Sequence, residues 1–77
     1  MDKYFFDVFP GLEVDQDLTN LFGQTTVNNV IVNKHDKVLS TYITSKRLIH
    51  YNYIALMEQE MEKQLFAQLG LTVKICE

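Results

Sequence analysis

The sequence predicts a small α/β chain of the α+β type, with the element order α-β-β-α-β and helices on one face of a three-stranded mixed sheet. Three observations indicate this fold. A segment near the C-terminus, 51–69, lacks Gly and Pro and repeats apolar residues at helical spacing. Two β-branched runs precede it, separated by a short polar turn. A segment with strict two-residue alternation follows it.

The long segment is predicted to form one helix from Tyr51 to Leu69. Its apolar stripe falls within about a quarter-turn of a helical wheel, as expected for a helix that lies on a sheet. The stripe consists of Ile54, Met57, Met61, Leu65 and Leu69. Gly70 is expected to end the helix, because a left-handed residue after the last turn is adopted most easily without a Cβ. The helix would be a rod of about 28 Å, long enough to cover the neighbouring strands.

A shorter amphipathic segment precedes the β-branched runs. Its apolar residues also recur at helical spacing, at Val14, Leu18, Leu21 and Phe22. This predicts a helix from about Asp15 to Phe22 that Gly23 ends. Asp15 and Asp17 sit where negative charge favours a helix N-terminus.

Three strands are predicted around the long helix. Val27–Asn33 and Lys37–Thr44 flank the polar turn Asn33–Asp36, and a turn of this length predicts an antiparallel hairpin. In the second strand, Leu39, Thr41 and Ile43 share one face. The third strand, Leu71–Cys76, is expected to run parallel to the second, either beside it or across the hairpin, because a strand–helix–strand connection favours a right-handed crossover.

Aromatic residues are concentrated at the N-terminus, at Tyr4, Phe5, Phe6 and Phe9. Phe5 and Phe9 are four residues apart, so a helical turn that ends before Pro10 would align them on one face. Two interpretations stay open. The arm packs across the open end of the core, or it presents aromatic anchors to a partner.

Length and composition narrow the class of protein. The 77 residues correspond to one domain of modest stability, expected to be a monomer. The net charge of −3 disfavours nucleic-acid binding by this domain alone. A single cysteine, Cys76, excludes an internal disulfide and fits a cytoplasmic location. No signal peptide and no apolar run of membrane-spanning length is present, so no membrane partner is expected.

No group of residues indicates a reaction, so no catalytic, cofactor-binding or metal-binding residues are predicted. His35 and His50 are interpreted as surface or capping residues. The polar side of the long helix, with Glu58, Glu60, Glu62 and Lys63, is interpreted as a solvated face. The only glycines are Gly11, Gly23 and Gly70, which excludes a GxxG loop and a P-loop. The element order is also that of a truncated KH module, here without the GxxG that KH domains use to hold nucleic acid.

Two sets of residues are candidates for binding. Leu56 and Phe66 lie off the apolar stripe and, together with Tyr53, Phe5 and Phe9, could form a docking surface for a protein. The alternative is that these side chains only lean on neighbouring loops. Lys46-Arg47 is the only adjacent basic pair and is a candidate phosphate contact.

Several short segments resemble one family, the N-terminal domain of PolC-type DNA polymerase III alpha subunits from Gram-positive, particularly clostridial, bacteria. The similar segments are Tyr4-Phe5-Phe6-Asp7-Val8-Phe9-Pro10-Gly11, Ser45-Lys46-Arg47-Leu48-Ile49-His50, Met57-Glu58-Gln59-Glu60, Lys63-Gln64-Leu65-Phe66 and Leu71-Thr72-Val73-Lys74-Ile75. The resemblance implies a domain similar in outline to the alpha-binding, C-terminal domain of the clamp-loader tau subunit, which has a reduced KH-like fold.

The resemblance also implies a function. Residues 1–77 would be a single non-catalytic N-terminal domain, cut from a replicative polymerase with a 3′–5′ exonuclease. The parent would need a divalent metal, whereas the family's catalytic carboxylates have no counterpart here and this domain needs no cofactor. We therefore expect a docking module for a protein partner in the bacterial replisome. The alternatives are a nucleic-acid binding module that uses the sheet face and Lys46-Arg47, and a structural cap that binds nothing.

Overall fold

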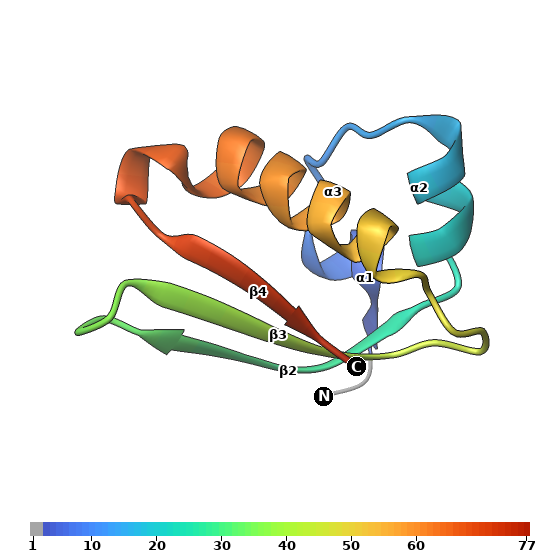
Figure 1. Cartoon of the computed structure of the whole chain (residues 1–77), viewed down its shortest axis with the longest axis horizontal. Coiled ribbons are helices and arrows are strands. Elements are labelled where there is room, and N and C mark those ends of the chain that lie inside the picture. Colours follow the sequence, from blue (N-terminus) through green and yellow to red (C-terminus); the bar gives the residue numbers. More distant parts are fainter. Residues whose placement is uncertain (1–2) are drawn as a thin grey trace.

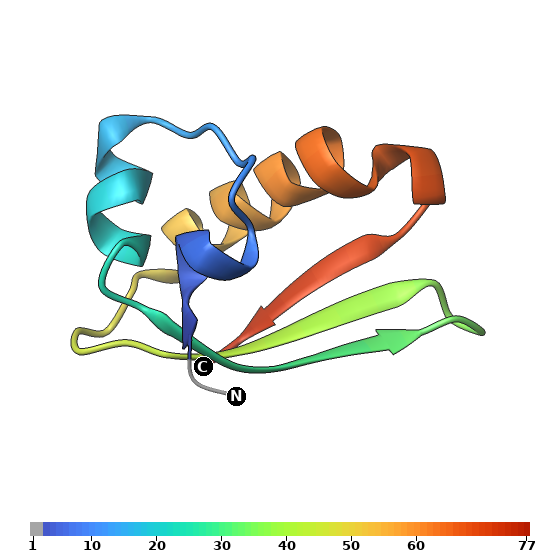
Figure 2. The ribbon, with the colours of Figure 1, turned by 180° about the vertical axis from the view of Figure 1, so that it is seen from behind.

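Within residues 3–77, all helices lie on one side of a twisted sheet, and no helix covers its other face (Figures 1 and 2). The computed structural model describes residues 3–77. The elements in chain order are β1 (Lys3–Tyr4), α1 (Phe5–Val8), α2 (Gln16–Phe22), β2 (Thr26–Asn33), β3 (Val38–Thr44), α3 (Tyr51–Met61) and β4 (Thr72–Cys76). A π-helical turn, Glu62–Phe66, and a 3₁₀ turn, Ala67–Leu69, connect α3 to β4. The mixed α+β architecture is confirmed.

The sheet has four strands in the order β1-β2-β3-β4, so the prediction of three strands was wrong. The additional strand, β1, pairs only Lys3 with Val27 and Tyr4 with Thr26. Two residues are too few to show an alternating pattern, which is why the sequence did not reveal it. As predicted, β2 and β3 are antiparallel, and β4 is parallel to β3. The structure places β4 beside β3, which decides between the two positions left open.

The core lies between the sheet and the helices. Leu39 and Ile43 of β3 and Val73 of β4 point toward the helices and are buried, as their alternation predicts. The other buried hydrophobic residues are Phe5, Phe9, Leu12, Leu18, Phe22, Val27, Ile49, Met57, Met61 and Ile75. The outward face of the sheet is polar except for residues such as Ile31 and Tyr42, which are exposed. One covered and one solvated face is the usual arrangement for sheets with antiparallel hairpins.

The predicted long helix is not uniform. Met57 and Met61 are fully buried, as the stripe predicts, but Leu69 is 64% exposed. The π-helical turn Glu62–Phe66 explains the difference. A π turn holds more residues than an α turn, so the residues beyond it are rotated off the stripe. Phe66, the last residue of the π-helical turn, was predicted to lie off the stripe, but it packs against the core, and its ring lies 6.4 Å from that of Phe9.

The helix ends mostly follow the predictions. Gly70 is left-handed, with φ 66°, and ends the long helical segment. Asp15 precedes α2, and its Oδ1 accepts a hydrogen bond from the backbone N–H of Leu18 at 2.9 Å. Gly23 follows α2 but is right-handed, with φ −64°. A Cβ there would lie 2.7 Å from the carbonyl oxygen of Thr19, so close packing favours glycine at this position.

The N-terminal aromatic arm packs across the core. Phe5 is fully buried and Phe9 is 7% exposed. The ring of Phe5 lies 5.1 Å from that of Phe9 and 5.0 Å from that of Phe22. Of the two interpretations of the arm, the structure shows the packing one, since neither Phe5 nor Phe9 offers an exposed ring to a partner.

Two glutamates of the long helical segment cover the outer edge of β4. Glu58 Oε2 accepts a hydrogen bond from the backbone N–H of Ile75 at 2.8 Å. Glu62 Oε2 accepts one from that of Val73 at 3.2 Å. The interpretation of these side chains as part of a solvated face was therefore wrong, because both are half-buried against an edge strand. Covering the free N–H groups of an edge strand prevents pairing with another chain.

Candidate functional site

A groove lies between α3 and the segment that leads into α2; we call it the α2–α3 groove. Its volume is about 380 Å³. The residues that line it are Glu13, Val14, Asp15, Leu18, Leu56 and Glu60. The two sides of the groove are about 40 residues apart in sequence, so only the tertiary structure brings them together.

One glutamine holds the two sides together. The side chain of Gln64 accepts a hydrogen bond from the backbone N–H of Glu13 at 2.8 Å and donates one to its carbonyl oxygen at 2.5 Å. The same Nε2 donates to Glu60 Oε1 at 2.7 Å. A side-chain amide can make these bonds at once because it carries both a donor and an acceptor. The Glu13 backbone and the Glu60 carboxylate are thereby held in place.

The groove combines an apolar floor with an acidic rim. The floor consists of buried Leu18, half-buried Val14 and Leu56, which is 46% exposed. The rim consists of Glu13, Asp15 and Glu60, and no Lys or Arg in the described part of the chain lines the groove.

Tyr53 extends the apolar surface along α3 beyond the groove. It lies on the same helical face as Leu56 and Glu60, because residues i, i+3 and i+7 align. Its side chain is 37% exposed.

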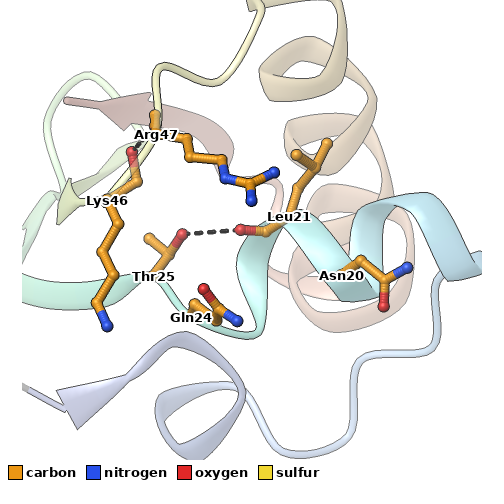
Figure 3. Close-up of a pocket in the computed structure, with 7 residues that line it drawn as sticks. Asn20, Leu21, Gln24, Thr25, Lys46 and Arg47 are labelled. Atoms are coloured by element: carbon orange, nitrogen blue, oxygen red, sulfur yellow. Dashed lines mark hydrogen bonds between the residues drawn. The ribbon is translucent and has the colours of Figure 1, made fainter.

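A second pocket lies beside the C-terminal end of α2 (Figure 3). It has a volume of about 260 Å³ and is lined by Asn20, Leu21, Gln24, Thr25, Ser45, Lys46 and Arg47. Thr25 Oγ1 donates to the carbonyl oxygen of Leu21 at 3.1 Å, and Ser45 Oγ donates to that of Arg47. The pocket therefore places the predicted basic pair beside the amide side chains of α2 and the segment that follows it.

The surroundings of Lys46 and Arg47 suit a structural role. Both side chains are exposed, and Arg47 points toward Leu21 near the end of α2, where the last carbonyl groups carry partial negative charge (Figure 3). Cations are favourable at this end of a helix, whereas an anion would be repelled by the same carbonyl groups. The geometry therefore supports a phosphate site less well than the pair of cations alone suggests.

The structure separates the residues that the sequence grouped as a docking surface. Tyr53 and Leu56 are exposed on α3, while Phe5, Phe9 and Phe66 pack into or against the core. Sequence reasoning missed Glu13, Val14, Asp15 and Gln64 as parts of a site. The only local signal was the i, i+4 spacing of Glu60 and Gln64, which places the two side chains side by side.

Both histidines occupy ordinary positions. His50 is the N-cap of α3, and its Nδ1 accepts a hydrogen bond from the backbone N–H of Asn52 at 3.2 Å. His35 is exposed in the hairpin turn. Within residues 3–77, no three His, Cys, Asp or Glu side chains are placed to hold a metal ion. In the same part of the chain, no helix is long and apolar enough to cross a membrane.

The fold and the site define the class as a small α+β domain with a mixed sheet covered on one face. Comparison with protein-family models then identifies the family: the model for the DNA polymerase III polC-type N-terminus I matches residues 4–75. The chain therefore belongs to the family of PolC-type DNA polymerase III N-terminal domains, and the predicted resemblance is confirmed. At the level of the family, this assigns the chain to DNA replication. Comparison with curated proteins found no match, and comparison with solved structures found none either.

Proposed function

We propose that this domain is a non-catalytic docking module that binds a protein partner in the bacterial replisome. It would be the N-terminal domain of a cytoplasmic replicative polymerase whose other domains carry the metal-dependent polymerase and 3′–5′ exonuclease. The observation that supports docking is the exposed apolar surface of α3, Tyr53 and Leu56, next to the α2–α3 groove. The family supports the setting in replication.

Position in the groove distinguishes Leu56 from the other exposed apolar residues. Single exposed apolar side chains are common and need no explanation. Leu48, for example, is 91% exposed and lines none of the pockets described above. Leu56 instead forms the floor of a concave surface together with Val14 and Leu18. Binding energy at protein interfaces concentrates where an anchor side chain fills such a pocket.

Direct binding to replisome proteins tests the proposal. The 77-residue chain is immobilised and exposed to purified clamp loader, helicase loader and single-strand-binding protein. We expect one of these proteins to bind, and Tyr53→Ser with Leu56→Ser to weaken that binding at least about tenfold, since burying a large apolar side chain contributes about 1.5–3 kcal/mol. Leu48→Ser is the matched control and should bind as the original chain does. No binding to any of the three at high micromolar concentration would refute the proposal.

Nucleic-acid binding is the second candidate function. It is supported by Lys46 and Arg47, two exposed cations that line the same pocket. The test is fluorescence anisotropy with a labelled single-stranded oligonucleotide over a salt series. If this candidate is right, the affinity falls steeply with salt, and Lys46→Ala with Arg47→Ala lowers the slope of log K against log salt by about 1.4, at about 0.7 for each lost phosphate contact. An affinity that the double substitution leaves unchanged would exclude this pocket as the site.

A further inference from the structure

The α2–α3 groove also indicates the chemistry of its partner. Building on the proposed docking function, we infer that the groove binds a short segment of a partner protein in which one large apolar residue is flanked by Lys or Arg. The apolar residue occupies the floor formed by Val14, Leu18 and Leu56, and the basic side chains pair with the acidic rim.

The floor fits one apolar anchor. The groove volume of about 380 Å³ lies near the lower end of the ~300–1,000 Å³ range of ligand sites. It therefore suits a single large side chain and the backbone beside it better than a whole helix face. Leu56 provides the exposed part of the floor and loses its contact with water when an anchor binds.

The negative charge of the rim determines which charge the partner segment should carry beside its apolar residue. Three carboxylates, those of Glu13, Asp15 and Glu60, border the groove, and no Lys or Arg within residues 3–77 lines it. Like charges across an interface are repelled, whereas complementary charges steer association and fix register. An acidic partner is thus excluded, and a basic one is favoured.

The rim is also held in place before any partner arrives. Asp15 is fixed by its hydrogen bond to the N–H of Leu18 at 2.9 Å, and Glu60 by the bond from Gln64 at 2.7 Å. The backbone of Glu13 is fixed by the same glutamine. Groups that are already ordered lose little conformational entropy on binding, which favours affinity.

Synthetic peptides test the inference without knowledge of the natural partner. The probe is a capped heptapeptide with a central Phe and three Lys on each side, titrated into the 15N-labelled 77-residue chain. Two matched probes replace the Phe by Ser or the six Lys by Glu. We expect amide shifts at Val14, Leu56 and Glu60, binding about tenfold weaker for the Ser probe, and no binding of the Glu probe.

Neutralising the rim separates the effect of its charge on binding from the effect of its hydrogen bonds. Glu13→Gln, Asp15→Asn and Glu60→Gln together remove three negative charges, while each new side chain keeps an oxygen that can accept a hydrogen bond. We expect the Lys probe to bind about tenfold more weakly to this triple variant, because each exposed charge pair contributes about 0.2–1 kcal/mol.

The matched control removes the same charge elsewhere. Asp7→Asn, Asp36→Asn and Glu77→Gln change the net charge equally at exposed positions outside the groove. The affinity of this variant for the Lys probe should change by less than about twofold, since exposed charges beyond the Debye length of about 10 Å are largely screened at 0.1 M salt.

Three outcomes would overturn the inference: equal binding of the Phe and Ser probes, shifts confined to other surfaces, or equal effects of the two triple variants. The proposed function fails separately, when the Lys probe binds the groove but no replisome protein binds the chain. Conversely, a replisome protein whose binding the rim variant leaves unchanged overturns the inference and leaves the docking function intact.

Discussion

Replacing Glu58 by Ala should destabilise the domain by uncovering the edge of β4. The Glu58 carboxylate accepts a hydrogen bond from the N–H of Ile75 at 2.8 Å, and a hydrogen bond to a charged group contributes about 1.5–3 kcal/mol. Glu58 is only half-buried, and the freed N–H lies at a sheet edge where water can reach it. We therefore expect the free energy of unfolding to fall by about 1.5 kcal/mol, the lower end of that range.

Glu58→Gln separates charge from hydrogen bonding at the same position. Its amide oxygen can still accept the hydrogen bond of Ile75, so the loss should be smaller, about 0.5 kcal/mol, as for the difference between charged and neutral acceptors. Gln59→Ala is the control, because Gln59 is exposed and adjacent in sequence. Its effect should stay within about 0.5 kcal/mol.

Urea unfolding followed by circular dichroism measures all three variants. For a domain of this size, 1 kcal/mol corresponds to about 4–8 °C in Tm, so thermal melts give an independent measure. Size-exclusion chromatography adds a second readout. The double variant Glu58→Ala with Glu62→Ala leaves the β4 edge open and should associate at high concentration. A Glu58→Ala variant that is as stable as Gln59→Ala would refute the argument.

Two further predictions concern stability. Thr41 and Thr25 are both fully buried, but Thr41 Oγ1 has no hydrogen-bond partner within residues 3–77, whereas Thr25 Oγ1 donates to the carbonyl oxygen of Leu21. In urea unfolding, Thr41→Val should therefore stabilise the domain by about 1 kcal/mol, and Thr25→Val should destabilise it by about the same amount. Changes of the same sign in the free energy of unfolding would contradict this. Gly70→Ala should lower the free energy of unfolding by about 1–2 kcal/mol in the same assay, because φ is 66° at Gly70. A steric clash is not the cause, since a Cβ there meets no other atom within 4 Å. Gly11→Ala is its control, where a Cβ is equally free and φ is unstrained, and a similar loss there would refute the backbone explanation.

Periodicity and helix-ending residues predicted most of the elements. The observed α2, β2, β3 and β4 begin and end within about one residue of their predicted bounds. These signals are local: a side chain that caps a helix or alternates along a strand acts within a few residues of its own position. The KH-like outline stays a prediction.

The candidate site was predicted only in part. Leu56 was identified because it lies off the apolar stripe, and Tyr53 was grouped with it; both side chains are exposed in the structure. Phe66 was misplaced because a wheel of 100° per residue cannot anticipate a π-helical turn. Phe5 and Phe9 were assigned two alternatives, since an aromatic side chain suits a core and an interface equally well.

By itself the sequence determined the order of α2, β2, β3, the long helical segment and β4, the residues that share a face of β3 and β4, and the family to which the chain belongs. Tertiary structure alone decided three features: the pairing of β1, the placement of Glu58 and Glu62 on the edge of β4, and the α2–α3 groove. Each of them joins segments that are at least ten residues apart. Such contacts depend on how whole elements pack together, and a local sequence pattern does not indicate which distant segment will lie beside it.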